Sequence, residues 1–136
     1  MTMHGLDALD RDECLAHLRR GGLGRMAFTN GEHPVIVPVL FAVLDDDIVI
    51  RTAPGEKLVA AALNQVVAFE IDEHDLHART GWSVLVVGRA EEVTHPDERA
   101  RCEDLGLEPW AGTARDRWVR IHTQELTGRR LHDAPE

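Results

Sequence analysis

Short apolar runs joined by tight-turn residues limit the folds open to this chain more than any other feature. Asn30-Gly31 separates the apolar runs 23–29 and 35–43, and the acidic residues 45–47 separate the second run from residues 48–52. Asn-Gly favours a two-residue hairpin, because both residues tolerate the positive φ angles of that turn. We therefore expect three antiparallel strands in a meander.

The second half of the chain adds strand-like runs at residues 66–72, 81–93 and 117–122. Short helices are expected at residues 10–20, 56–63 and 96–105. Asp10 and Glu13 form a capping box for the first helix, and Pro96 suits the start of the last. Residues 73–80 are polar and predict a loop, and residues 1–8 and 132–136 predict loose ends.

These elements do not alternate as β-α-β units, so they argue against a parallel sheet. Short strands with tight turns and helices at the periphery favour a small antiparallel barrel. The length of 136 residues suits one domain with a real core, so we expect a single domain over residues 1–136.

The charge balance excludes several classes of partner. The chain has 24 acidic and 15 basic residues and a net charge of -9. Nucleic-acid binders usually carry a basic excess or stripe, and an acidic surface disfavours anionic membranes. The longest apolar run, residues 35–44, is too short to span a bilayer. The two cysteines form no metal spacing and no disulfide framework, which indicates a reducing, cytoplasmic compartment.

Residues 51–57 are the best candidate for binding an anion. Arg51 and Thr52 end a strand, a Pro-Gly turn follows, and Lys57 is the only lysine of the chain. Two cations and a hydroxyl next to a turn are a plausible cradle for a phosphate. An ordinary turn flanked by exposed cations explains the same spacing, so the residues alone leave both interpretations open.

Pro38 interrupts the apolar run Val35, Ile36, Val37, Pro38 and Val39. Proline cannot donate to a ladder, so Pro38 predicts a strand edge or a bulge. An ordinary edge strand would explain it. A functional interpretation is that a flat ligand lies along this edge and meets backbone groups that the sheet leaves unpaired.

Other candidate sites give weaker signals. Ser83, the only serine, follows Trp82 on an expected strand and has no nucleophile elbow around it, so we expect no catalytic serine and no other catalytic side chain. Trp82 by itself is more typical of core or subunit packing. His74 and His77 lie among acidic residues, but the spacing matches no tight zinc signature, so we expect no metal site.

Taken in order, several segments resemble the pyridoxamine 5'-phosphate oxidase-like family of flavin-binding split-barrel proteins. The resemblance covers residues 9–131. The segments that carry it are 24–27 (GRMA), 35–39 (VIVPV), 50–58 (IRTAPGEKL), 68–72 (AFEID), 81–84 (GWSV), 87–90 (VGRA) and 127–130 (TGRR).

The resemblance implies a mainly β, six-stranded antiparallel Greek-key split barrel with short peripheral helices. It also implies a homodimer that binds FMN in a groove between its subunits and acts as an oxidoreductase on a small-molecule substrate. By similarity, five consecutive residues line the isoalloxazine, largely through backbone contacts: Val35, Ile36, Val37, Pro38 and Val39.

By the same similarity, Arg51 and Thr52 meet the ribityl phosphate and Lys57 neutralises it. Ser83 takes the place of a polar flavin-contacting side chain, and Trp82 borders the flavin or the partner subunit. The chain departs from the oxidases at Glu56, where they carry a second cation, and has no clear counterpart of their substrate-binding C-terminal part. The alternatives are a deazaflavin-dependent reductase on the same fold and a non-catalytic flavin- or ligand-binding module.

Overall fold

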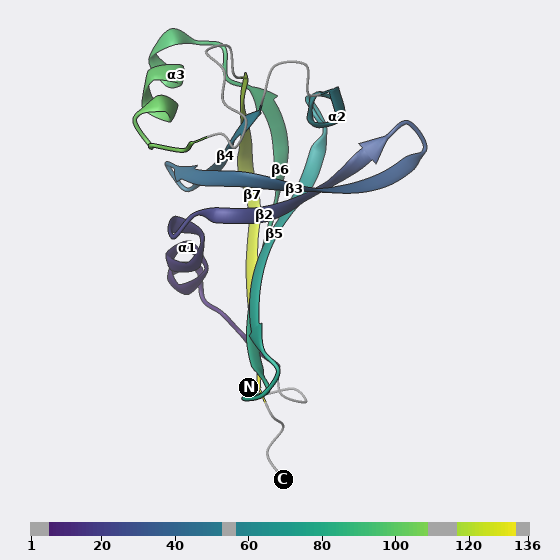
Figure 1. The fold of residues 1–136 in the computed structure, drawn as a ribbon, viewed down its shortest axis with the longest axis vertical. Coiled ribbons are helices and arrows are strands. Elements are labelled where there is room, and N and C mark those ends of the chain that lie inside the picture. The colour runs from purple at the N-terminus through teal and green to yellow at the C-terminus, as the bar shows by residue number, and fades with distance from the viewer. Residues whose placement is uncertain (1–5, 53–56, 109–116, 133–136) are drawn as a thin grey trace.

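A single antiparallel sheet, curled into a barrel, forms the body of the molecule. The computed structural model describes residues 6–52, 57–108 and 117–132. The strands are β1 (Leu6–Ala8), β2 (Gly22–Asn30), β3 (His33–Leu44), β4 (Asp47–Thr52), β5 (Val66–Asp75), β6 (Thr80–Glu92) and β7 (Arg117–Leu131). Figure 1 shows β7 running along most of the long axis, with β5 and β6 beside it.

The strand order confirms the predicted barrel. The sheet runs β1-β7-β4-β3-β2-β5-β6, and β6 also pairs with β7, so six strands close on themselves. The meander β2-β3-β4 is followed by β5, which returns to lie beside β2; this is a Greek key. The six-strand expectation omitted β1, which pairs with the end of β7 through Leu6, Asp7 and Ala8. That part of the predicted loose leader is therefore a strand.

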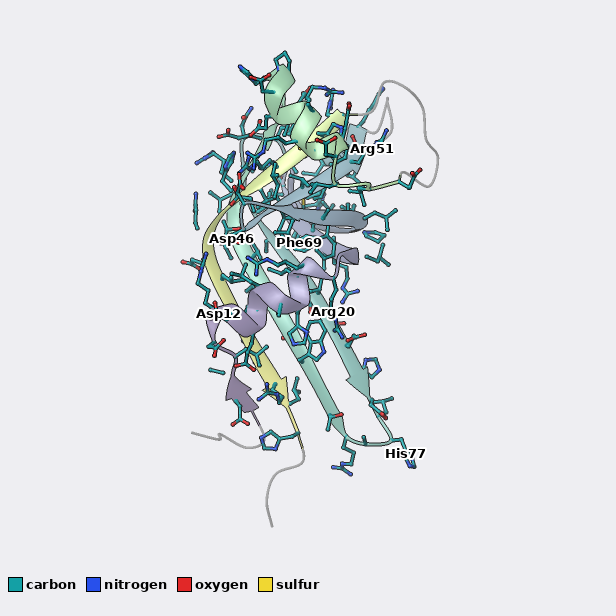
Figure 2. All side chains as sticks on the ribbon, turned by 90° about the vertical axis from the view of Figure 1, so that its left-hand side faces the viewer. Asp12, Arg20, Asp46, Arg51, Phe69 and His77 are labelled. Carbon is teal, nitrogen blue, oxygen red and sulfur yellow. The ribbon has the colours of Figure 1, made fainter. Side chains whose placement is uncertain are left out.

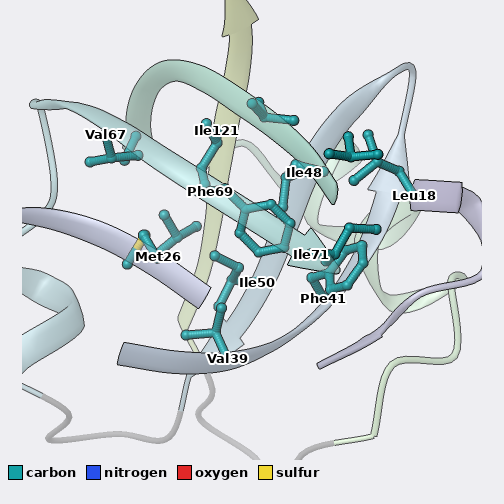
Figure 3. Packing of buried hydrophobic residues seen from close by; sticks show 14 of the residues in the cluster. Leu18, Met26, Val39, Phe41, Ile48, Ile50, Val67, Phe69, Ile71 and Ile121 are labelled. Atoms are coloured by element: carbon teal, nitrogen blue, oxygen red, sulfur yellow. The ribbon is translucent and has the colours of Figure 1, made fainter. Parts of the chain in front are cut away.

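Inward-facing apolar side chains fill the barrel (Figure 3). Phe41 from β3 and Phe69 from β5 meet edge to face, with ring centroids 4.8 Å apart. Gly24 on β2 leaves room for this pair, since a Cβ at that position would overlap the Phe69 ring. A second, smaller cluster lies outside the barrel wall and consists of Leu44, Val49, Val93, Cys102 and Trp118.

The three helices lie outside the sheet (Figure 1). Helix α1 (Arg11–Arg19) begins with the predicted capping box, in which Asp10 accepts from the Glu13 amide and the Glu13 side chain accepts from the Asp10 amide. Helix α2 (Lys57–Ala60) is shorter than predicted, and Glu56 lies outside the described residues. Helix α3 (Pro96–Glu103) covers the outer cluster through Cys102. None of the helices in the described ranges has the length and apolar content that crossing a membrane requires.

Strands β5, β6 and β7 extend further than the sequence suggested. The predicted loop at residues 73–80 is wrong at both ends, because β5 continues to Asp75 and β6 begins at Thr80. Strand β7 continues to Leu131 instead of ending near His122. These extensions pair with one another, Glu73 with Trp82 and Trp82 with Arg130. Their residues are mostly exposed on both faces, so they lack the apolar alternation that marks a half-buried strand.

Strand β7 contains a bulge where it passes β6. Val87 pairs with Glu125 and Gly88 pairs with Thr123, so Gln124 is one extra residue on β7. A Cβ at Gly88 would overlap the carbonyl oxygen of His122, which explains why glycine stands there.

Candidate functional site

The two edges of β3 are paired to different extents. The whole of β2 pairs with residues 33–41 of β3. The pairing of β3 with β4, in contrast, covers only residues 41–44 of β3. Residues 35–39 therefore have one edge that β4 does not cover. Pro38 lies on this stretch, as the prediction of an edge strand required.

The side chains of this stretch alternate between the core and the surface. Val37 and Val39 are buried and Val35 is half-buried against the same cluster, whereas Pro38 is exposed and Ile36 is 69% exposed. No other strand of the described residues pairs with this side of residues 35–39, which we call the open edge of β3. A ligand there would meet the backbone of residues 35–39 and the outward side chains of Ile36 and Pro38. The arrangement suits a flat, partly apolar molecule that also carries hydrogen-bonding atoms at its rim.

Arg51 and Thr52 end β4 but point to opposite faces, because neighbours on a strand alternate. The Arg51 guanidinium donates to the Leu107 carbonyl oxygen at 2.9 Å and lies 5.3 Å from the centre of the Trp118 ring. The Thr52 hydroxyl is buried and donates to the Arg117 carbonyl oxygen at 3.4 Å. The side chains of Arg51 and Thr52 therefore do not converge on a common anion-binding point.

Lys57 is the first residue of α2 and is exposed. It follows residues 53–56, which lie outside the described part, so the predicted cradle is described only at its two ends. An exposed ammonium group a few residues after a strand end matches the predicted phosphate contact in kind.

Trp82 and Ser83 lie at the other end of the barrel. Trp82 pairs with Arg130 and Ser83 with Arg129, whereas Thr52 pairs with Arg117. Residues 117 and 130 are the two ends of β7, up to about 40 Å apart at the rise of an extended strand. In Figure 2, Arg51 accordingly lies near the top of the molecule and His77, at the tip of the β5–β6 hairpin, near the bottom. One protomer does not bring these two groups of predicted site residues together.

Three hollows include Trp82 in their lining, and one of them, of about 780 Å³, also includes Ser83. A groove of about 690 Å³ is lined by residues of the β5–β6 hairpin and by Arg130. A smaller hollow of about 340 Å³ lies between α1 and the sheet and is lined partly by His17, Arg20 and Leu23. Trp82 is half-buried and contributes to all three. Ser83 points to the opposite face, where it also lines a hollow with Glu70 and Arg129.

A charged cluster that was not predicted lies on the outer face of the sheet. Arg25 on β2 pairs with Glu70 at 2.8 Å and with Asp72 at 2.6 Å, both on β5. Burial and the hydrogen bond with Asp72 raise the pKa of Glu70, whereas the hydrogen bonds from Glu70 and Arg25 lower the pKa of Asp72. The pKa values of the two carboxyl groups are thus shifted in opposite directions. The contact joins residues 45 positions apart, a separation that no local pattern encodes.

His74 and His77 lie among acidic residues of the chain. In the part of the chain that the structure describes, no three His, Cys, Asp or Glu side chains gather closely enough to hold a metal ion. His74 belongs to β5 and His77 to the hairpin turn, and both are exposed.

Comparison with known proteins finds a matching family model and relatives that align over most of this chain. The model of the family described as pyridoxamine 5'-phosphate oxidase matches residues 10–130. The uncharacterized protein Rv0080 of Mycobacterium tuberculosis is 40% identical over 128 residues, which are 90% of this chain and 84% of that protein.

Two solved structures have the same fold. An FAD-binding protein from Mycobacterium smegmatis superposes with a TM-score of 0.85 at 38% identity, over 94% of this chain and all of that one. An FAD-binding protein from Mesorhizobium loti gives a TM-score of 0.75 at 27% identity, over 93% of this chain and 98% of that one.

Proposed function

The chain belongs to the pyridoxamine 5'-phosphate oxidase family, and from that premise we propose that it is a homodimeric, FMN-binding oxidoreductase acting on a small molecule. The open edge of β3 at residues 35–39 is the observation that carries the proposal. A flavin ring is flat, apolar on its faces and lined with amide-type donors and acceptors, which is the chemistry that this edge suits.

The residues that the chain offers fit such a cofactor in kind. The backbone of residues 35–39 would hold the ring rim, and Ile36 and Pro38 would contact its face. Lys57 would bind the phosphate, with the backbone near Thr52 beside it. When bound, the flavin supplies hydride or electron transfer, and the protein supplies position and electrostatics.

Arg51 has a different part in this proposal from the one first expected. Its guanidinium is held by the Leu107 carbonyl oxygen and the Trp118 ring. It would therefore fix the end of β4, and hence the start of the phosphate-binding segment, through packing. A direct contact with the phosphate remains a prediction from family resemblance.

The separation of the two groups of site residues favours a dimer. Thr52 and Lys57 lie at one end of the barrel and Trp82 and Ser83 at the other, a span longer than one flavin mononucleotide. Two protomers related by a two-fold axis would place one end of each beside the other end of its partner. Each flavin would then receive its phosphate contacts from one protomer and Trp82 from the second.

The outer face of β3, β2, β5 and β6 is the surface that we propose for the second copy. Ile36, Ala27, Ala68 and Val87 lie in one row across these strands, and Val66 nearby is 48% exposed. The row is apolar and mostly small, so two backbones can approach closely. It is also continuous with the open edge of β3.

A direct test is a visible spectrum of freshly purified protein, followed by titration of the apoprotein with FMN. We expect flavin absorbance bands and near-stoichiometric binding. A preparation that is colourless and binds no flavin would refute the cofactor assignment and favour the non-catalytic module.

The same titration separates the alternative cofactors. FAD is a second candidate because two relatives of known structure are named FAD-binding proteins. A deazaflavin coenzyme is a third, on grounds of fold resemblance. Tighter binding of either, measured side by side with FMN, would replace FMN in the proposal.

The dimer is tested with Ala68→Glu, which places a charge in the apolar row. Sedimentation should show a monomer that has lost flavin affinity. Ala100→Glu is the matched control, because Ala100 is exposed on α3, away from this face. If the wild type is monomeric yet binds flavin fully, the two-protomer site is wrong.

A further inference from the structure

Three side chains of α1 and its C-terminal cap each contact one side chain of the sheet, where β5, β6 and β7 extend beyond the barrel. Glu13, His17 and Arg20 lie four and three positions apart, which places them on one face of the helix. Arg130, Trp82 and Glu73 form one row across β7, β6 and β5. Each member of the helix face meets one member of the row.

The two outer pairs are ionic and the middle pair is aromatic. Arg130 donates to Glu13 at 2.7 Å, and Arg20 donates to Glu73 at 3.4 Å. Between them, the rings of His17 and Trp82 stack with centroids 3.7 Å apart and planes 17° from parallel. The ion pairs restrict sliding of α1 along the row, so the imidazole stays over the indole.

His17 suits this position as a neutral ring. Burial, and next the neighbouring Arg20, lower the pKa of His17, while Glu73 and Glu13 act against the shift. The imidazole is therefore uncharged at neutral pH, and a flat neutral ring stacks on an indole without bringing a charge into a half-buried place. Part of Trp82 still faces two of the hollows described above.

We infer that His17 is a positioning residue for the flavin site: it holds the Trp82 ring in the orientation in which Trp82 borders the cofactor of the neighbouring protomer. The inference rests on the proposed function. It adds a residue from α1, an element to which neither the sequence nor the family resemblance gave any part in the site. A tryptophan that is fixed before binding loses little side-chain entropy when the ligand arrives.

The test compares flavin titrations of the wild type, His17→Ala, Trp82→Ala and the double variant. Loss of one aromatic partner is expected to weaken flavin binding about threefold to tenfold. In the Trp82→Ala background, His17→Ala should have no further effect, because the residue it positions is gone. His17→Phe, which keeps a flat ring, should restore most of the affinity.

A second readout does not depend on the cofactor. The near-ultraviolet circular dichroism of the apoprotein should lose a tryptophan band in His17→Ala and keep it in His17→Phe. His77→Ala is the control, since His77 is exposed on the hairpin turn. Far-ultraviolet spectra and unfolding midpoints verify that each variant is folded.

The outcomes separate two failures. If the wild type binds no flavin, the proposed function fails and takes this inference with it. If the wild type and His17→Ala bind flavin equally well, His17 has no positioning role. The same conclusion holds if His17→Ala weakens flavin binding as much in the Trp82→Ala background as in the wild type.

Discussion

The two ends of the barrel are held by different kinds of contact. At the β4 end, Arg51 lies against Trp118, which is only 1% exposed and belongs to a buried cluster under α3. At the other end, α1 holds Trp82 through one ring stack and two ion pairs whose charged groups are 41% to 65% exposed. The first end is stabilised by packing and the second by contacts that water weakens. A site assembled from both ends would combine a rigid half with an adjustable half.

The largest expected effect comes from removing the packing at the rigid end. Trp118→Ala should lower the free energy of unfolding by about 3–5 kcal/mol, the usual cost of emptying a buried aromatic site. Trp82→Ala, at the half-buried end, should cost clearly less. Denaturant unfolding of both variants measures the comparison, and equal losses would contradict the contrast between the two ends.

Lys57→Ala should weaken flavin binding by about 1.5–3 kcal/mol, the range for hydrogen bonds to charged groups. Stability should stay unchanged because Lys57 is exposed. Arg11→Ala, which removes another exposed cation, is the control. Fluorescence titration of both variants tests the anion site, and wild-type affinity in Lys57→Ala would count against it.

Asp10→Ala removes the N-cap of α1 and should cost about 1 kcal/mol of stability. Because α1 carries His17, the same variant should also loosen the stack on Trp82. The near-ultraviolet tryptophan signal would then fall before global unfolding during a thermal melt. Coincident transitions would show that the adjustable end does not loosen separately.

The smallest effect concerns pH and the Arg25–Glu70–Asp72 cluster. The pKa of Asp72 is lowered in the folded protein, so its contribution is present above the unfolded value, about 3.9, and is lost as the pH falls through the folded pKa. Asp72→Asn should therefore reduce the melting temperature at pH 7, and this effect should disappear once the pH falls below the folded pKa of Asp72. The groups are partly exposed, so we expect below about 1 kcal/mol.

Glu70→Gln gives the opposite sign and completes that comparison. The raised pKa of Glu70 means that its neutral form suits the fold, so its favourable contribution is present below the unfolded pKa and lost as the pH rises through the folded one. The stability of Glu70→Gln relative to the wild type should therefore be higher at pH 7 than at pH 3. Parallel pH profiles for the two variants would show that the carboxyl groups are not coupled.

Local sequence signals predicted most of the architecture. The capping box of Asp10 and Glu13 and the meander β2-β3-β4 are each encoded within a few residues. The first hairpin turn falls at Gly31-Glu32, one residue later than the predicted Asn30-Gly31, because Asn30 still pairs with His33. Pro38 predicted a strand edge or a bulge, and it lies on the part of β3 that β4 does not cover, although β3 as a whole runs between β2 and β4. These features need no knowledge of distant contacts.

The errors have two physical causes. The polar ends of β5 and β6 pair locally, as Glu73 does with Trp82, but they lack the apolar alternation that marks a strand. The other errors occurred where partners lie far apart in the chain, as for β1, which is a strand because it pairs with the end of β7. The stack of His17 on Trp82 joins residues whose types suggested nothing in common. For Arg51, residue type and spacing predicted an anion contact, but they carried no information on the carbonyl of Leu107 or the ring of Trp118.

The single extra residue in β7 decides which side chains the adjustable end receives. Before Gln124, odd-numbered residues such as Val119 and Ile121 face the core; after it, the even-numbered Leu126 packs against the core, and Arg130 lies on the same side of β7 and pairs with Glu13 of α1. Deleting Gln124 would exchange the two sides of everything that follows, turning Arg130 away from Glu13. Substituting Gln124 would leave the sides as they are. The molecule should therefore tolerate substitution of this exposed residue far better than its deletion.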